Sequence, residues 1–307
     1  MNKKLIVILG QTASGKTALS IKLARKFNGE IISADSRQVY KGLDVGSGKI
    51  TKKEMQGIPH HLLDVASPAR KFTVAQYQKL ALRAIKKIHQ KNKLPFLVGG
   101  TGFYIQSIVE GMAIPDVKPN WKLRKKLSSY SVEKLYGMLK KLDPARAKTI
   151  DPKNPVRLIR AIEIVTLSGK PVPKTLRGHT SQSFDVLQIG IKRTPDELKK
   201  AIYIRLQKRI KGIIKEVRKL NKNGLSFRRL EELGLEYRYA AQYLQDKISY
   251  EEMETKLEKE IWQFSKRQMT WFKRDTRIHW VKTQKQAENL IKDFIKKECP
   301  TSEEIKH

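Results

Sequence analysis

Residues 5–17 read Leu5-Ile6-Val7-Ile8-Leu9-Gly10-Gln11-Thr12-Ala13-Ser14-Gly15-Lys16-Thr17. The first five form a short apolar run that predicts a buried strand, and the next eight match the phosphate-binding pattern G-x-x-x-x-G-K-[ST]. In such a P-loop, backbone N–H groups surround an anion at the start of a helix, the lysine adds positive charge, and the hydroxyl can hold Mg²⁺. The segment predicts a diphosphate site but does not distinguish ATP from another diphosphate.

Two further apolar runs, residues 30–34 and 94–98, also end on polar or glycine-rich turns. Residues 1–110 therefore alternate short strands with helical patterns, as in a parallel sheet with crossover helices. Ligands of open α/β sheets bind beyond the carboxyl ends of the strands, so we expect the three turns to meet at one crevice. The predicted fold class is α/β, a P-loop NTPase-like parallel sheet flanked by helices.

The residue pattern changes after Gly111, where prolines separate short basic segments such as residues 121–126. We expect a helical insertion over residues 111–185. The catalytic core is expected over residues 1–110 and 186–307.

Two strands and a long helix are predicted in the C-terminal part. The apolar runs 187–191 and 278–281 are the strand candidates. Apolar residues recur every three or four positions between 202 and 220, which predicts a helix with Arg205 and Arg209 on one face.

The composition is strongly basic. Across 307 residues, 64 Lys and Arg against 30 Asp and Glu give a formal net charge of +34. A polyanionic partner is the natural interpretation, and solvated lysine-rich faces are the alternative. Cys299 is the single cysteine, which excludes intramolecular disulfides and a multi-cysteine zinc module. No stretch approaches about eighteen consecutive apolar residues, so we expect a cytoplasmic protein without a membrane span.

Asp35 stands at the end of the second predicted strand, where its carboxylate would face the phosphate site. It could act as a general base, bind a metal ion or cap the strand end. The turn Gly99-Gly100-Thr101-Gly102 allows close backbone approach to a ligand and presents Thr101, but a plain strand-to-helix turn would use the same residues. The residues alone leave these choices open.

Three other segments combine residue types suited to binding. Adjacent His60 and His61 have no partner at metal-ligand spacing, so we expect a structural role for both. The turn at 46–49 ends in Lys49, which either adds a phosphate contact or lies solvated in a loop. Residues 266–274 mix cations with rings that could bind RNA, or the rings could belong to a core.

In this order, the segments resemble the tRNA dimethylallyltransferase (tRNA isopentenyltransferase) family of bacterial type. The resemblance spans almost the whole chain and rests on residues 10–17, Asp35-Ser36-Arg37-Gln38-Val39-Tyr40, Pro59-His60-His61-Leu62-Leu63-Asp64, Val98-Gly99-Gly100-Thr101-Gly102-Phe103-Tyr104, Arg157 with Arg160-Ala161-Ile162-Glu163, and Lys266-Arg267-Gln268-Met269-Thr270-Trp271. Family members transfer the dimethylallyl group of dimethylallyl diphosphate to N6 of adenosine 37 of tRNA, beside the anticodon.

The resemblance implies a role for each matching residue. Asp35 is the expected general base, Thr101 is expected to position the reacting amine and the diphosphate, and Lys16 is expected to stabilise the leaving group. The expected diphosphate ligands are Gly10, Gln11, Thr12, Ala13, Ser14, Gly15, Lys16 and Thr17, with Arg205 or Arg209, and Thr17 is the expected Mg²⁺ ligand. The expected tRNA contacts are Asp35, Ser36, Arg37, Gln38, Thr101, Arg124, Val156, Arg157 and Arg160.

The chain departs from the family pattern at Gln11, where proline is usual, and at Val156, where glutamine is usual. Leu235-Glu236-Tyr237 stands where a Gly-Tyr pair is common. We expect a monomeric enzyme that binds the tRNA anticodon stem-loop and dimethylallyl diphosphate. The alternatives are an adenylate isopentenyltransferase acting on AMP, a P-loop small-molecule kinase, and a basic RNA-binding protein without catalytic activity.

Overall fold

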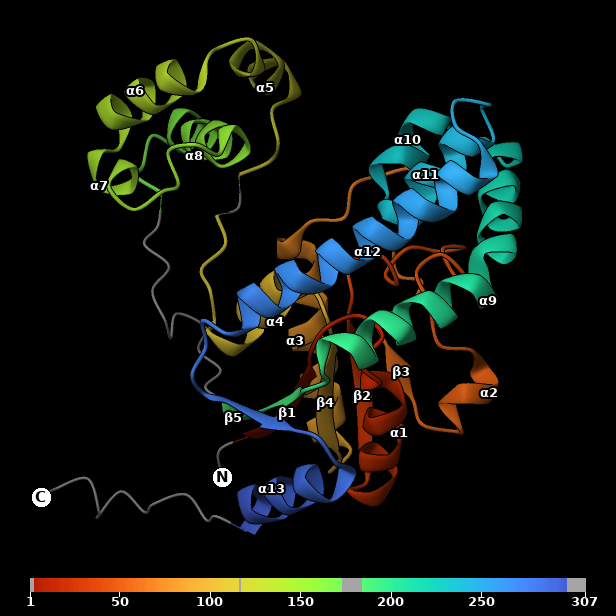
Figure 1. Ribbon diagram of the computed structural model, residues 1–307. Helices are drawn as coiled ribbons and strands as arrows, with labels where there is room; N and C mark the ends of the chain where they lie inside the picture. Colours follow the sequence, from red (N-terminus) through yellow and green to blue (C-terminus); the bar gives the residue numbers. More distant parts are fainter. Residues whose placement is uncertain (1–2, 116, 173–183, 297–307) are drawn as a thin grey trace, which may run out of the picture. The chain divides into compact units, whose positions relative to one another are not determined.

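The computed structural model describes residues 3–115, 117–172 and 184–296. The chain divides into two compact units, one made of residues 1–109 and 183–307 and the other of residues 110–182 (Figure 1). The second unit corresponds in position to the insertion expected over residues 111–185. Among the described residues, no helix is both long and apolar enough to cross a membrane.

A six-stranded parallel sheet forms the centre of the larger unit (Figure 1). Its strands are β1 (Lys3–Leu9), β2 (Gly29–Ala34), β3 (His60–His61), β4 (Leu94–Gly99), β5 (Phe184–Ile191) and β6 (Ile278–Val281). They lie in the order β3-β2-β4-β1-β5-β6, and all neighbouring pairs are parallel. The predicted α/β class is confirmed, and the carboxyl ends of the strands share one edge.

Helices cover both faces of this sheet. They are α1 (Lys16–Lys26), α2 (Lys52–Met55), α3 (Val74–Gln90), α4 (Gly102–Val109), α9 (Pro195–Lys222), α10 (Phe227–Glu232), α11 (Leu235–Tyr243), α12 (Tyr250–Phe272) and α13 (Gln284–Lys296). Leu5, Val7 and Leu9 of β1 join the core formed with α3, α4, α9, α11 and α12. Ile6 and Ile8 point to the opposite face, toward α1 and α13. Burial on both faces explains the uninterrupted apolar run of β1.

The two longest helices begin at complete capping boxes. The side chain of Thr194 accepts from the N–H of Glu197 at the start of α9, and Ser249 accepts from Glu252 at the start of α12. In both boxes the glutamate side chain bonds back to the N-cap N–H, which satisfies two donors that the helix leaves free. These helices carry several of the residues that surround the candidate site.

The smaller unit consists of α5 (Trp121–Ser128), α6 (Val132–Leu142), α7 (Pro144–Ala147) and α8 (Pro155–Ser168). Its own core includes Leu127, Leu135, Leu139 and Leu158, all at most 1% exposed. Asn154 caps α8 through its side chain, and Pro155 follows at the first helical position, where the missing N–H costs nothing.

Candidate active site

The phosphate-binding loop joins β1 to α1. Gly10 has a φ of 147°, and a Cβ there would lie 3.2 Å from the carbonyl oxygen of Ile191, so glycine suits this close approach of two chains. Gly15 is the N-cap of α1 and has no side chain to cap it, which leaves first-turn N–H groups available for an anion. Ser14 Oγ is buried and has no hydrogen-bond partner among the described residues. A diphosphate oxygen in this loop would accept a hydrogen bond from this hydroxyl.

A cavity of about 710 Å³ opens at the carboxyl edge of the sheet. The turns after β1, β2 and β4 all line it, which confirms their expected convergence. The predicted site residues in its lining are Thr12, Ala13, Ser14, Gly15, Lys16, Thr17, Asp35, Ser36, Arg37, Gln38, Thr101 and Arg205. Gly10, Gln11 and Arg209 are not in the lining.

Lys16 extends its ammonium along the loop and donates to the carbonyl oxygen of Gln11 at 2.5 Å. Its pKa is lowered to about 7, chiefly because burial removes water from the charge and secondly because Arg205 lies nearby, while Asp35 acts in the opposite direction. A bound diphosphate would supply negative charge and raise this pKa again.

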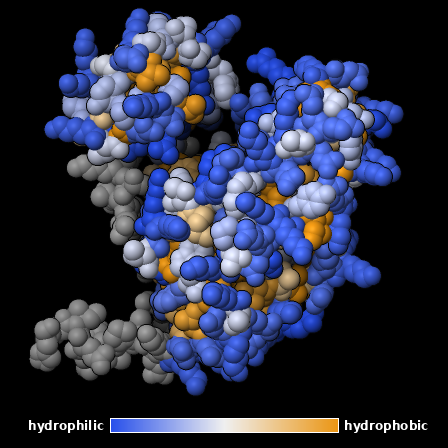
Figure 2. Space-filling model, viewed as in Figure 1, coloured by the Kyte–Doolittle hydropathy of each residue, from blue (hydrophilic) through white to orange (hydrophobic). Residues whose placement is uncertain are grey.

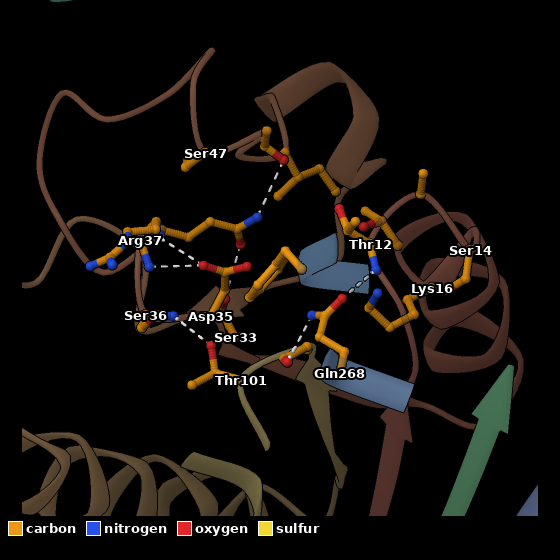
Figure 3. A pocket seen from close by; sticks show the side chains of 18 of the residues that line it. Thr12, Ser14, Lys16, Ser33, Asp35, Ser36, Arg37, Ser47, Thr101 and Gln268 are labelled. Carbon is orange, nitrogen blue, oxygen red and sulfur yellow. Dashed lines mark hydrogen bonds between the residues drawn. The ribbon is translucent and has the colours of Figure 1, made fainter. Parts of the chain in front are cut away.

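Asp35 directly follows β2. Its Oδ1 accepts from the N–H of Arg37 at 2.8 Å and from the N–H of Gln38 at 3.4 Å (Figure 3). Thr101 reaches the same turn, because its Oγ1 accepts from the N–H of Ser36 at 3.0 Å. The carboxylate therefore caps its own turn and also lines the cavity, so a strand-end cap and a chemical role are compatible.

The structure separates the two arginines of α9. Arg205 donates from Nη2 to Thr12 Oγ1 at 2.6 Å, within the phosphate-binding loop. Its pKa is lowered, mainly by burial and then by Arg209. Arg209 turns instead to the carbonyl oxygens of Val45 and Gly46. Of the two candidates for a phosphate clamp, only Arg205 lies at the loop.

Gln268 of α12 joins the two glycine-rich turns. Its Oε1 accepts from the N–H of Thr12 at 2.7 Å, and its Nε2 donates to the carbonyl oxygen of Gly100 at 2.9 Å (Figure 3). Gln11 binds the same helix, donating to the carbonyl oxygen of Ser265 at 3.0 Å. In the sequence, Gln268 belongs to a basic segment that also matches the family pattern, and nothing local indicates this bridge.

Arg193, in the loop between β5 and α9, makes another contact that the sequence did not indicate. Its Nε donates to the carbonyl oxygen of Ser14 at 3.1 Å. The phosphate-binding loop is thus held from outside by side chains of distant segments.

The smaller unit carries the remaining predicted tRNA contacts. Arg124 donates to both carboxylate oxygens of Glu163, at 2.8 and 2.7 Å, and Arg160 donates to Oε2 at 2.5 Å. Glu163 is fully buried. Burial opposes its ionisation, but hydrogen bonds from Arg124 and Arg160 hold its pKa below the usual range. Arg124 and Arg160 therefore neutralise a buried carboxylate, which is a structural role separate from the predicted contact with RNA.

The other two predicted contacts of this unit lie at its surface. Arg157 is exposed on α8, and the neighbouring Val156 is 75% exposed. Both residues are in the first turn of the helix.

Three predictions made on short segments are resolved by the structure. Lys49 is neither a phosphate contact nor solvated, because its nearly buried side chain forms ion pairs with Asp44 at 2.6 Å and Asp64 at 2.5 Å. His61 has the expected structural role, with Nε2 2.8 Å from Oε2 of buried Glu30. Phe272, considered for RNA stacking, is 3% exposed and belongs to the core.

The donor set in the cavity fits a magnesium ion that arrives with a diphosphate. Mg²⁺ prefers oxygen ligands and commonly combines one or two protein oxygens with substrate phosphates and waters. Thr17, which is exposed, and Asp35 both line the cavity. Among the described residues, no cluster of three or more His, Cys, Asp or Glu side chains could hold a metal alone.

Fold and site together define an α/β P-loop protein in which a phosphate-binding loop and a strand-end carboxylate face one cavity. A model of the family described as IPP transferase matches residues 38–275. The chain belongs to the IPP transferase family.

Relatives resemble the chain over nearly its whole length. A tRNA dimethylallyltransferase from Carboxydothermus hydrogenoformans is 40% identical over 303 residues, 96% of this chain and 97% of the relative. One from Halalkalibacterium halodurans is 38% identical over 288 residues, 91% of each chain. The crystal structure of a full-length tRNA isopentenylpyrophosphate transferase from Bacillus halodurans has a TM-score of 0.72, 34% identity, and coverage of 95% of this chain and 97% of that one. The structure of a eukaryotic dimethylallyltransferase acting on tRNA has a TM-score of 0.82 and 26% identity, with coverage of 98% of this chain and 81% of that one.

Proposed function

We propose that this protein transfers the dimethylallyl group from dimethylallyl diphosphate to N6 of adenosine 37 of tRNA and releases diphosphate. The observation that carries the proposal is the single cavity in which Lys16, Asp35 and Thr101 meet. The named relatives support tRNA as the acceptor, in preference to AMP and to the phosphoryl transfer of a kinase.

The leaving group is held by the phosphate-binding loop. As the allylic C–O bond breaks, negative charge accumulates on the diphosphate, and preorganised N–H groups with Lys16 and Arg205 stabilise that charge. Thr17 would hold Mg²⁺, which when bound neutralises part of the same charge. Arg205 is already tied to Thr12, so it needs little movement to reach a phosphate oxygen.

The acceptor is activated by Asp35. Adenine N6 is a poor nucleophile because its lone pair is delocalised into the ring, so a carboxylate that takes its proton lowers the barrier. Thr101 contacts the N–H next to Asp35 and positions the amine beside it.

The strong positive charge suits the tRNA substrate. A base in the anticodon loop must leave its stack to enter a cavity, at a cost of a few kcal/mol that phosphate contacts offset. Both units present a largely hydrophilic surface in Figure 2. We expect the enzyme to act as a monomer on the anticodon stem-loop, in the cytoplasm.

The direct test is mass analysis of nucleosides from tRNA incubated with protein, Mg²⁺ and dimethylallyl diphosphate. Dimethylallyl adenosine at position 37 is the expected product, with far lower turnover of AMP because AMP lacks the backbone that positions the base. Comparable kcat/KM for AMP and an anticodon stem-loop would instead favour an adenylate isopentenyltransferase.

Asp35→Asn is the variant that tests the chemistry. It removes the proton acceptor but keeps the shape, so transfer should fall by roughly 10² to 10⁴. Affinity for tRNA, measured by filter binding, should stay within several-fold. Loss of tRNA binding in parallel with the rate would reassign Asp35 to recognition or to structure.

A further inference from the structure

Residues 44–48 form a loop whose last three residues are part of the wall of the substrate cavity. Gly46, Ser47 and Gly48 all line it, and the segment contains turns but no helix or strand. Irregular loops open more easily than the elements that they connect. A wall of this kind needs outside support if it is to keep its shape.

Glu216 of α9 supplies this support to the backbone donors of the loop. The N–H groups of Asp44 and Val45 donate to Oε2 at 2.9 and 2.6 Å, and the N–H of Gly46 donates to Oε1 at 3.0 Å. Successive N–H groups around one anion form a nest like those that bind phosphate. Here the anion is a side chain of the protein, and bonds to a charged acceptor are stronger than neutral ones.

Tyr237 fixes the carboxylate from the other side. Its hydroxyl donates to Oε1 of Glu216 at 2.8 Å, and its side chain is fully buried. A Cβ at Gly46 would lie 2.5 Å from the Tyr237 ring, so only glycine allows the loop to approach so closely.

Arg209 holds the acceptors of the same loop. It donates from Nη2 to the carbonyl oxygens of Val45 and Gly46, the latter at 2.8 Å. Arg209 and Glu216 are two turns apart on α9 and therefore lie on one face of it. The single helix α9 therefore binds both the backbone donors and the backbone acceptors of the loop.

Gln38 connects the loop to Asp35. Its Nε2 donates to the carbonyl oxygen of Gly48 at 3.2 Å, and its own N–H donates to Oδ1 of Asp35 at 3.4 Å. Its Oε1 accepts from Ser33 Oγ at 3.0 Å. A shift of the loop would therefore reach the carboxylate through one side chain.

We propose that Glu216 is a positioning residue for the transfer reaction. Its carboxylate occupies the nest of residues 44–46 and holds the cavity wall in place. Through Gln38 it also keeps Asp35 aligned with the acceptor amine. The inference rests on the proposed function. Misplacing a reacting group by about 1 Å can cost on the order of 10² in rate, so Glu216 acts on the rate and not on the affinity for dimethylallyl diphosphate.

The test compares Glu216→Gln with Glu258→Gln, a matched control that makes the same charge change at an exposed position of α12. In Glu216→Gln we expect the single-turnover rate at saturating substrates to fall by about 10- to 100-fold. The Kd for dimethylallyl diphosphate should stay within about 3-fold. Hydrogen exchange at the amides of residues 44–46 should accelerate, and Glu258→Gln should match the wild type in all three measurements.

Tyr237→Phe keeps the inference testable if Glu216→Gln fails to fold. It removes one bond to the carboxylate, so a smaller loss of rate with unchanged diphosphate affinity is expected. A native single-turnover rate in either folded variant would overturn the role of Glu216 while leaving the proposed function intact. A wild-type protein that modifies no tRNA would refute both.

Discussion

The fold disfavours the charged ammonium of Lys16, and we expect a bound diphosphate to stabilise it. Its pKa is lowered to about 7, first by burial and then by Arg205, whereas in the unfolded chain it stays near 10.5. Between these values the unfolded chain binds a proton that the free folded protein does not, so the cost of burying this group falls as the pH rises from 7 to 10.5. Below about pH 7 its burial cost is fully present.

Lys16→Met should therefore stabilise the free protein while it inactivates the enzyme. Methionine has a similar length and no charge, so the free energy of unfolding at pH 7 should rise by on the order of 1–3 kcal/mol. The rate of transfer should fall by about 10² or more, because the negative charge that develops on the departing diphosphate is no longer stabilised by the Lys16 ammonium. Urea unfolding and single-turnover kinetics check both effects, and a less stable variant would contradict the assigned burial cost.

Arg205 and Arg209 form a matched pair for substitution, one turn apart on α9 and with different targets. Arg205→Ala should weaken dimethylallyl diphosphate binding by about 10- to 100-fold, the size expected for a charged hydrogen bond. Arg209→Ala should change it by less than about 3-fold and mainly loosen residues 44–48. Calorimetric titration distinguishes the two, and equal losses would show that the clamp involves both guanidinium groups.

At the scale of elements, Glu163 ties α5 to α8 through Arg124 and Arg160. Removing both arginines leaves a fully buried carboxylate without cationic partners, whereas removing Glu163 leaves two arginine side chains that are about one-third exposed and can hydrate. The cost of breaking this network therefore depends on which side is removed.

The double substitution Arg124→Ala with Arg160→Ala should destabilise residues 110–172 by about 3–5 kcal/mol. Glu163→Gln should cost less, about 1–3 kcal/mol. Limited proteolysis and hydrogen exchange confined to this unit would measure both, and binding of dimethylallyl diphosphate to the larger unit should not change. If Glu163→Gln proved the more damaging, buried charge would not be the dominant cost.

The net charge of +34 acts at the scale of the whole molecule. If about five to eight phosphates are contacted, tRNA affinity should fall by roughly 10² to 10⁴ between 50 and 200 mM salt. Arg157→Ala removes an exposed cation that has no place in the Glu163 network, so it should reduce the salt slope by about one. Filter binding over a salt series tests this, and an unchanged slope would place the RNA surface elsewhere.

Much of the architecture could be predicted because its signals are local. The phosphate-binding loop is a backbone structure set by contiguous residues, and the apolar runs of β1, β2, β4, β5 and β6 mark buried strands. The two-residue strand β3 was not predicted, since His60 and His61 pair with β2 over only two positions and leave no periodic pattern. The convergence of the three turns also follows from the sequence, because parallel strands place their carboxyl ends on one edge.

The partners within the site were decided by tertiary structure alone. Arg205 and Arg209 are the same residue type on the same predicted helix face, so the sequence does not distinguish them. Their different partners depend on where α9 crosses the two loops. The bridge from Thr12 to Gln268, the nest around Glu216 and the pairing of Arg124 with Glu163 join groups whose spacing carries no unique signal. The sequence by itself determined the α/β class, the phosphate-binding loop and the candidate carboxylate, because short-range sterics and periodic burial are encoded locally. Which side chains support them depends on contacts made only when distant segments pack.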